Sequence, residues 1–391
     1  MFGFIVFTLV VGILIYSRFY TTAYNTPPNA TATHMTNLVS HYRFREETHD
    51  ISGVKIHCAV KDATDPSTDV LVFIHGTASS SATFFDTMKA LPPTMKCVAI
   101  DLPTFGISGH IDVDRYSTNE QLCIAYADII GNTLIKLNIL NQTILVAHSL
   151  GGFLSIYVAD RFPIKKLVLL NPAGILPTLG VYGYYWGMFF KAGLPTSVYQ
   201  LPMISSELLT YLGRWWWTGN ADNHNDPNIE FWLSFYANPA NEGHRILQRL
   251  ITLRPFYSYW NTPAISTLTD VYKKVPTSIC FGVEDTIIPS HTGAFLRTLT
   301  QGDIMIHNIQ NANHNPCTNI QCMVKFLTDI YNNYTTGTKP ERSWRNFSDN
   351  KHKGRNNRGY SYPLLEKTQA SFQNVYDYIL TNTTPHSKSP L

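Results

Sequence analysis

Short apolar runs recur along the chain, and most of them are followed by a stretch with a helical pattern. A run of four or five apolar or β-branched residues is typical of a strand that is buried on both faces of a sheet. Strands that alternate with helices are joined by crossovers, which predicts that they run parallel. The runs of this kind are residues 70–74, 96–100, 143–147, 166–170, 277–283 and 304–309. The pattern therefore predicts an α/β fold with a mostly parallel central sheet flanked by helices.

The composition of the chain changes at several points and divides it into segments. Residues 41–46 and 54–60 predict a strand pair that opens the folded core. A polar stretch with Pro27 and Pro28 indicates a linker, and a polar, basic C-terminal stretch predicts a largely disordered tail. The predicted segments are an apolar anchor at 1–20, a linker at 21–40, the first part of the core at 41–172, an insertion at 173–275, the second part of the core at 276–335 and the tail at 336–391.

The insertion interrupts the alternation of strands and helices and is dense in aromatic residues. Tyr182–Phe190 and Trp215–Trp217 are the richest stretches. Most of these rings are expected to pack a small second layer of helices. Some of them are also expected to line an apolar tunnel above a binding site, and the two roles are compatible. We therefore interpret the insertion as an aromatic-rich helical lid.

The N-terminal stretch Met1–Ser17 has no charged side chain and is rich in Phe, Ile, Val and Leu. It indicates a single-pass, uncleaved membrane anchor; the alternative is a buried N-terminal helix, since a span needs about 20 apolar residues. Arg18 after the span favours a cytoplasmic domain by the positive-inside rule. Sequons follow at Asn29, Asn141, Asn333, Asn346 and Asn382. Asn, Ser and Thr are so frequent that about four sequons are expected by chance, and the side of the membrane stays open.

The overall composition is that of a globular protein. Of the 391 residues, 44% are hydrophobic and 13% are aromatic, which excludes a chain that is disordered throughout. The formal net charge is +3, and between Lys339 and Arg358 seven Lys or Arg stand against two acidic residues. This basic stretch lacks the interleaved aromatic residues of a base-stacking surface, so a solvated segment is favoured over nucleic-acid or anionic-lipid binding. The sequence carries no signal for an oligomeric state.

The six cysteines are scattered along the chain. Cys58, Cys97 and Cys280 lie within apolar strand-like runs and are expected to be buried thiols. No spacing typical of a metal site or a disulfide framework occurs. We therefore predict neither a metal ion nor a cofactor.

Ser149 stands between the predicted strand 143–147 and a predicted helix that ends before Pro163. A sharp strand–serine–helix turn with small residues two positions before and two after the serine is a nucleophile elbow, because the two backbones nearly touch there. Gly151 supplies one small residue, and Ala147 takes the place of the other glycine. The context of a strand and a helix makes an elbow more plausible than an ordinary glycine-rich turn, and Ser149 is the candidate nucleophile.

A serine hydroxyl needs a base to accept its proton and a carboxylate to orient that base. In this arrangement the acid and then the base follow later strands in the chain. Asp285 follows the strand at 277–283, and His314 follows the strand at 304–309. Glu284 is the rival acid, and it is expected to lie at the surface. His307 is the rival base, and its place within a strand favours a buried core histidine.

Acyl transfer also needs hydrogen-bond donors for the oxyanion. One donor is expected to be the backbone N–H of Leu150, at the start of the helix after the nucleophile. The second is expected in the loop after an early strand, where His75-Gly76-Thr77 follows residues 70–74. Gly76 permits close approach of the backbone, so the N–H of Thr77 is the candidate.

These motifs together resemble the α/β-hydrolase superfamily over roughly residues 41–333. The residues that carry the resemblance are His75-Gly76 with Phe84 downstream, the stretch from Asp101 to Ser108, the elbow from Ala147 to Gly152, Gly282 with Asp285 and Pro289, and His314. Thr104, like Ala147, stands where the family usually has glycine. The lid and the N-terminal anchor are similar to those of the membrane-bound, monoacylglycerol-lipase-like members.

The resemblance implies a membrane-anchored serine hydrolase that cleaves an acyl ester of a small-molecule or lipid-like substrate. Ser149 would be the nucleophile, His314 the base and Asp285 the residue that orients it. Epoxide hydrolases and haloalkane dehalogenases of this fold use a carboxylate nucleophile, and Ser149 argues against both. Two alternatives stay open, namely a catalytically silent binding protein on the same scaffold and a C–C bond hydrolase or peptidase with the same triad.

Overall fold

The computed structural model describes most of the predicted core. The described residues are 28–64, 69–76, 79–112, 115–173, 263–285, 288, 290, 293, 296, 304–335 and 345–347. All of them belong to the larger of two compact units, Met1–Asp349. The predicted anchor, most of the predicted lid and most of the predicted tail lie outside the described residues.

The described strands form one nine-stranded sheet with the order β1-β2-β4-β3-β5-β6-β7-β8-β9. The pairs β1–β2 and β2–β4 are antiparallel, and all other neighbours are parallel. The prediction of a mostly parallel sheet is therefore confirmed. The strands are β1 (Arg45–Ile51), β2 (Val54–Lys61), β3 (Val70–Ile74), β4 (Lys96–Ile100), β5 (Thr143–His148), β6 (Lys166–Leu170), β7 (Thr277–Gly282), β8 (Met305–Ile309) and β9 (Arg345–Phe347).

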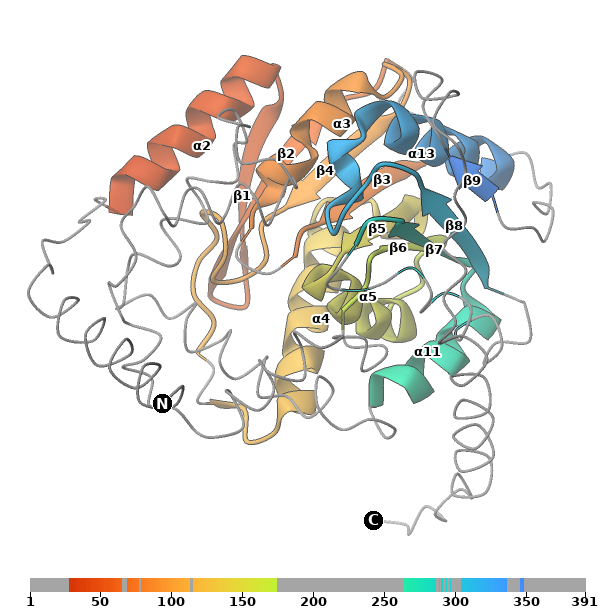
Figure 1. Ribbon diagram of the computed structural model, residues 1–391. Coiled ribbons are helices and arrows are strands. Elements are labelled where there is room, and N and C mark those ends of the chain that lie inside the picture. Colours follow the sequence, from red (N-terminus) through yellow and green to blue (C-terminus); the bar gives the residue numbers. More distant parts are fainter. Residues whose placement is uncertain are drawn as a thin grey trace, which may run out of the picture. The chain divides into compact units, whose positions relative to one another are not determined.

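Helices cover both faces of this sheet, as Figure 1 shows. One face carries α2 (Pro28–Tyr42), α3 (Phe85–Ala90) and α13 (Ile320–Thr335), and the other carries α4 (Asn119–Lys136), α5 (Leu150–Arg161) and α11 (Pro263–Lys274). Alternation along β3 explains how one strand serves both layers. Val72 and Ile74 pack toward α4 and α5, whereas Leu71 and Phe73 pack toward α3 and α13. Burial on both faces accounts for the uninterrupted apolar runs in the sequence.

The order of the strands in the sheet reverses beside β3. The chain passes from β3 to β4 on one side and then returns to β5 on the other side of β3. In open α/β sheets, ligands bind outside the carboxyl ends of the strands at such a reversal. The residues that follow β3 and β5 are His75 and Ser149. The topology therefore brings two of the sequence motifs to the position where a site is expected.

Several predicted boundaries differ from the observed ones at the start of the core. Residues 28–42 form α2, where the sequence predicts a linker up to residue 40. Met35 and Val39 are four residues apart and buried, so a narrow apolar stripe was hidden among polar residues. The first strand is Arg45–Ile51, not 41–46. It is a largely exposed edge strand, and its polar sequence therefore gives no hydrophobic run.

Two further elements lie in segments that were predicted to be outside the core. The end of the predicted lid forms α11, and its residues Leu268 and Val271 are buried in the same cluster as α5. Within the predicted tail, Arg345–Phe347 form β9 and pair with His307–Ile309 of β8. A strand of three residues is too short to produce a recognisable pattern.

A capping box begins α4, but it lies one residue later in the chain than the sequence pattern predicts. The sequence suggests a capping box that begins at Ser117. In the structure Thr118 is the N-cap, its hydroxyl accepts from the N–H of Gln121, and the Gln121 side chain accepts from the N–H of Thr118. Glutamine at the third helical position completes the box as well as glutamate does.

The cysteines Cys58, Cys97 and Cys280 are buried, as predicted, and none of the six cysteines forms a disulfide. Within the described ranges no group of three His, Cys, Asp or Glu side chains is placed to hold a metal ion. The described helices also include none that is long and apolar enough to cross a bilayer. The predicted anchor, residues 1–20, lies outside the described residues.

Candidate active site

Ser149 lies at the turn between β5 and α5, in a backbone conformation that is rare for residues with a side chain. Its φ is 49° and its ψ is −116°. Such strain persists only where neighbouring contacts hold it. The Ser149 N–H donates to Leu170 O over 3.0 Å, and the Ser149 carbonyl accepts from the N–H of Ala173 over 3.0 Å. The turn presents the Ser149 hydroxyl at the carboxyl end of the sheet.

Close packing of β3 against α5 explains the small residues around the serine. A Cβ atom on Gly151 would lie 2.3 Å from His75 O and 2.7 Å from Ile74 O. These are backbone atoms, which cannot move aside as a flexible side chain can. Ala147 lies within β5, where it is fully buried and pairs with Ile74 and Leu169. The single methyl group of alanine therefore fits the position that glycine usually takes in an elbow.

Three polar side chains from three parallel strand ends meet at the elbow. His314, in the loop after β8, has Nε2 3.0 Å from Ser149 Oγ. Its Nδ1 lies 2.8 Å from Asp285 Oδ2, just after β7. All three side chains are buried, with between 4% and 8% of their surface exposed. The order Ser149, His314, Asp285 is the geometry of a nucleophile, a base and an orienting carboxylate.

The rival residues lie away from this row of contacts. Glu284 is exposed, and its backbone N–H donates to Ala312 O over 2.9 Å. His307 is buried within β8, where its ring packs edge-on against Phe326 with 4.9 Å between the ring centroids. The geometry therefore favours Asp285 and His314 over these two residues.

Close approach of the β7 end to the loop that carries His314 requires a glycine at position 282. A Cβ atom on Gly282 would lie 2.1 Å from Asn313 O and 2.5 Å from Ala312 O. The backbone N–H of Glu284 also donates to Ala312 O. The two loops are thus held against each other, which fixes the distance between Asp285 and His314.

Asn171 is a part of the site that the sequence motifs do not indicate. It follows β6, and its side-chain Nδ2 donates to Asp285 Oδ2. Its Oδ1 accepts from the N–H of Gly282 over 3.1 Å. The available signal in the sequence was its place directly after an apolar strand, at the same sheet edge as Ser149 and Asp285. The remaining Asp285 oxygen, Oδ1, accepts from the N–H of Ile288 over 2.9 Å.

His148, next to the candidate nucleophile, contacts the backbone of the candidate base. Its Nε2–H donates to His314 O over 2.8 Å, and the two rings lie 5.0 Å apart. Burial, together with the nearby His314, lowers the pKa of His148 from 6.5 to about 3. His148 is therefore neutral at physiological pH, and as a donor it helps to hold the loop of His314 in place.

This buried histidine predicts a pH-dependent stability. The unfolded chain takes up a proton at His148 below about pH 6.5, whereas the folded protein does so only near pH 3. The neutral, buried His148 therefore makes its full contribution to the free energy of unfolding above about pH 6.5. This contribution is lost as the pH falls toward 3, by up to about 1.4 kcal/mol per pH unit. His148→Gln keeps a donor near the position of Nε2 and removes the titration. Urea unfolding at several pH values should give a shallower acid slope for the variant, and equal slopes would contradict the assignment.

The predicted oxyanion donors are the backbone N–H groups of Leu150 and Thr77. Leu150 is the first residue of α5, so its N–H belongs to the unpaired N–H groups of a helix start. Thr77 lies outside the described residues. The neighbouring Gly76 carbonyl accepts from His75 Nδ1–H over 2.7 Å, while His75 Nε2 accepts from the N–H of Leu102 over 3.0 Å. These contacts require a neutral His75, and burial lowers the pKa of this ring.

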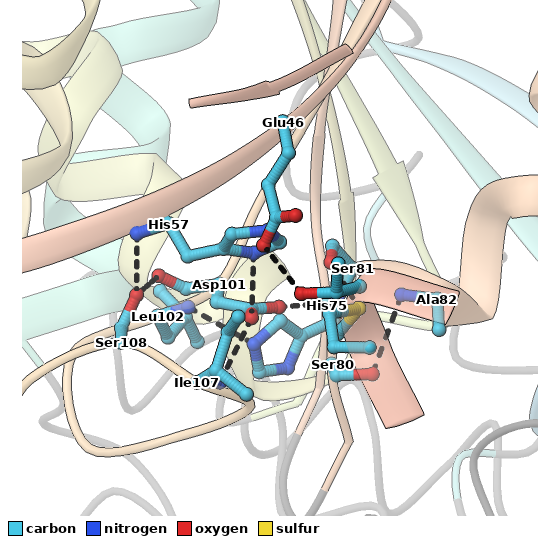
Figure 2. A network of polar contacts seen from close by, with 12 residues as sticks. Glu46, His57, His75, Ser80, Ser81, Ala82, Asp101, Leu102, Ile107 and Ser108 are labelled. Carbon is cyan, nitrogen blue, oxygen red and sulfur yellow. Dashed lines mark hydrogen bonds and ion pairs between the residues drawn. The ribbon is translucent and has the colours of Figure 1, made fainter. Parts of the chain in front are cut away.

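A buried carboxylate, Asp101, lies at the centre of a polar network beside His75 (Figure 2). Its Oδ1 accepts from the N–H of Ser81 over 2.6 Å, and its Oδ2 accepts from the N–H of Ile107 and from His57 Nδ1, each over 3.0 Å. Burial by itself raises the pKa of Asp101, but the electrostatic interaction and hydrogen bond with His57, together with the other contacts, outweigh burial and lower the pKa. Glu46 Oε1 lies 3.3 Å from the other nitrogen of His57. The network ties the turn at Ser81 to the loop after β4.

Thr104, in the loop after β4, has a backbone φ of 72°. This is the left-handed region that glycine adopts most easily. The hydroxyl of Thr104 accepts from the N–H of Ile111 over 3.2 Å, and its own N–H donates to Gly109 O over 2.8 Å. These two bonds hold threonine in the conformation that the loop requires.

The chain is similar to known proteins in sequence and in structure. Among curated proteins, the chain is similar to a cis-3-alkyl-4-alkyloxetan-2-one decarboxylase of Shewanella oneidensis, with 25% identity over 249 residues, or 61% of this chain and 73% of that protein. Among solved structures it resembles a bacterial membrane phospholipase A, with a TM-score of 0.60 and 17% identity over 86% of this chain and 99% of the other. It also resembles the Cif epoxide hydrolase of Acinetobacter nosocomialis, with a TM-score of 0.57 and 17% identity over 79% and 98%.

The similar structures show only the fold of this chain, because proteins with different activities share that fold. The chemistry has to be inferred from the residues of the site. The sequence itself matches the Alpha/beta hydrolase family over residues 71–322. This range runs from β3 to the start of α13 and contains Ser149, Asp285 and His314. It covers more than half of the 391 residues, and the chain therefore belongs to the Alpha/beta hydrolase family.

Proposed function

We propose that the protein is a serine hydrolase that cleaves a carboxylic ester through an acyl-enzyme intermediate. The observation that carries this proposal is the row of contacts from Ser149 Oγ to His314 Nε2 and from His314 Nδ1 to Asp285 Oδ2, at 3.0 and 2.8 Å. The row joins a nucleophile, a base and an orienting carboxylate, which together make a serine hydroxyl reactive.

In the first half of the reaction, Ser149 Oγ attacks the carbonyl carbon of the ester. The hydroxyl proton passes to His314 Nε2, and the carbonyl π electrons move onto the oxygen. The N–H groups of Leu150 and Thr77 are the proposed donors to this oxyanion. When the intermediate collapses, the C–O bond to the alcohol breaks, and His314 returns the proton to the departing oxygen. Asp285 holds the ring and stabilises its charged form.

In the second half, water takes the place of the alcohol. His314 accepts a proton from the water molecule as its oxygen attacks the acyl carbon, and the same donors stabilise the second oxyanion. Collapse breaks the bond to Ser149 Oγ, which recovers its proton from His314. The carboxylic acid leaves, and no cofactor is consumed.

A lipid-like ester is the substrate class that we propose. The lid predicted over residues 173–275 supports it through the aromatic stretches Tyr182–Phe190 and Trp215–Trp217. The resemblance to a solved membrane phospholipase A supports it as well. If such rings line a tunnel, each buried CH₂ of a substrate chain adds about 0.8 kcal/mol, or nearly a fourfold gain in kcat/KM.

We also propose that the N-terminal segment, residues 1–20, anchors the protein in a membrane. Met1–Ser17 carries no charged side chain, and Arg18 follows it directly. Every proposed catalytic residue lies after His41, so a chain without residues 1–20 should stay active. Carbonate extraction of the full-length protein from membranes tests the anchor, and complete release into the supernatant would argue against it.

A panel of esters from acetyl to palmitoyl tests the proposed function on the full-length protein. We expect hydrolysis whose kcat/KM rises over several carbons of the acyl chain and then levels off. A peptide substrate and a C–C bond substrate in the same panel separate esterases from the two other users of a serine triad. Labelling by a fluorophosphonate without turnover of any ester would favour these alternatives, and no labelling at all would favour a silent binding protein.

A further inference from the structure

A four-residue segment, Leu170–Ala173, holds both the nucleophile turn and the end of β7. On one side, Leu170 O accepts from the N–H of Ser149, and the N–H of Ala173 donates to Ser149 O, each over 3.0 Å. On the other side, the backbone N–H of Asn171 donates to Cys280 O over 2.8 Å. The segment therefore lies between the two strand ends that carry Ser149 and Asp285.

Asn171 occupies the centre of this segment in a conformation that few side chains tolerate. Its φ is 42°, in the left-handed region where asparagine is enriched among residues other than glycine. The residue is fully buried. A buried amide must find partners for both of its ends, because each unpaired polar atom costs free energy. Asn171 finds them in Gly282, the last residue of β7, and in Asp285, which lies in the loop that follows.

The orientation of the Asn171 amide follows from these partners. The N–H of Gly282 is a donor, so the atom 3.1 Å from it must be the amide oxygen. The amide nitrogen then faces the carboxylate of Asp285, which accepts its hydrogen bond at Oδ2. Oδ2 is also the oxygen that faces His314 Nδ1. Oδ2 of Asp285 thus accepts hydrogen bonds from both Asn171 and His314.

We propose that Asn171 is a positioning residue that holds the Asp285 carboxylate in the orientation that serves His314. The inference rests on the proposed function in one respect, since it assigns His314 as the base. Together with the N–H of Ile288 on Oδ1, the amide of Asn171 restrains the buried carboxylate against rotation. It also compensates the negative charge when His314 is neutral. Asn171 itself contacts no reacting atom.

Two variants separate this role from a structural one. Asn171→Ala removes the donor, and we expect kcat to fall roughly 10- to 100-fold with KM changed by less than about twofold. Asn171→Asp keeps the shape and the acceptor toward Gly282 but faces Asp285 with a second carboxyl. Two carboxyl groups in contact share one proton, and only the protonated form can donate. The activity of this variant relative to wild type should therefore decline as the pH rises.

Asn138 provides the matched control. It is another asparagine with a left-handed backbone, φ 56°. It lies after α4 and before β5, whereas Ser149 follows the other end of that strand. Asn138→Ala and Asn138→Asp impose the same change in backbone preference, and we expect kcat and its pH profile to match wild type within about twofold. Unchanged kcat in Asn171→Ala, or a parallel pH profile in Asn171→Asp, would overturn the proposal.

A readout that needs no turnover distinguishes failure of this inference from failure of the proposed function. The proton between His314 Nδ1 and Asp285 Oδ2 should give a downfield resonance in the proton NMR spectrum of the full-length protein. We expect the resonance in wild type and Asn138→Ala, its loss in Asp285→Asn, and its weakening or upfield shift in Asn171→Ala. An unchanged resonance in Asn171→Ala would overturn the positioning role whether or not an ester is hydrolysed. If Asn171→Ala does not fold, the pH series of Asn171→Asp and its resonance at low and high pH decide the question.

Discussion

Replacing Ser149 with alanine is expected to abolish esterase activity and fluorophosphonate labelling while the protein stays folded. In serine triads, loss of the nucleophile costs on the order of 10⁶ in kcat. Alanine has the same Cβ atom as serine, so the substitution does not change the steric strain of the turn at φ 49°. The lost hydroxyl contacts His314 Nε2, a contact that serves the reaction and does not stabilise the core. The melting temperature should therefore change little.

Labelling followed by peptide mapping gives a direct check of the Ser149→Ala prediction. Ser155 is the matched control, because it lies on the same helix, α5, and is fully buried. Ser155→Ala should be labelled at the wild-type rate. If a different serine carries the probe in wild type, or if Ser149→Ala is still labelled, then Ser149 is not the nucleophile. Equal loss in both variants would instead indicate a general disturbance of α5.

The strands that position the candidate site were predictable from sequence because both of their faces are buried. Phe73 in β3 and Val146 in β5 belong to continuous apolar runs, since neighbouring residues enter opposite helical layers. The same reasoning fails for β1, whose mostly exposed side chains leave no run to detect. It fails for α2 as well, where the apolar stripe that contains Met35 and Val39 is narrow.

The candidate site was predictable where chemistry demands a residue type in a fixed order along the chain. Ser149, Asp285 and His314 follow three strands in the order expected of a nucleophile, an acid and a base. Asn171 and His148 carry no such signal. Each acts through a contact with a residue more than one hundred positions away, Asp285 and His314 respectively. Such partners become visible only when the sheet brings the strand ends together.

After Ser149→Ala, the largest expected loss of activity follows from a substitution of Asp285. Asp285→Asn should lower kcat on the order of 10⁴-fold, by comparison with the same change in other serine triads. The amide keeps the shape of the carboxylate but can present an N–H to His314 Nδ1. The ring would then carry its proton on Nε2, the atom that must accept the proton of Ser149. The buried site also loses the negative charge that stabilises the charged imidazole during the reaction.

Glu284→Gln is the matched comparison, because the two acids are adjacent and the change in charge is the same. Glu284 is exposed, whereas Asp285 is 4% exposed and lies 2.8 Å from His314 Nδ1. We therefore expect kcat of Glu284→Gln to stay within about twofold of wild type, as for most surface substitutions. Steady-state kinetics of both variants on one ester, with melting temperatures as a folding check, decides between them. If Glu284→Gln were the more damaging change, the orienting role would belong to Glu284, and the contact between His314 and Asp285 would be structural.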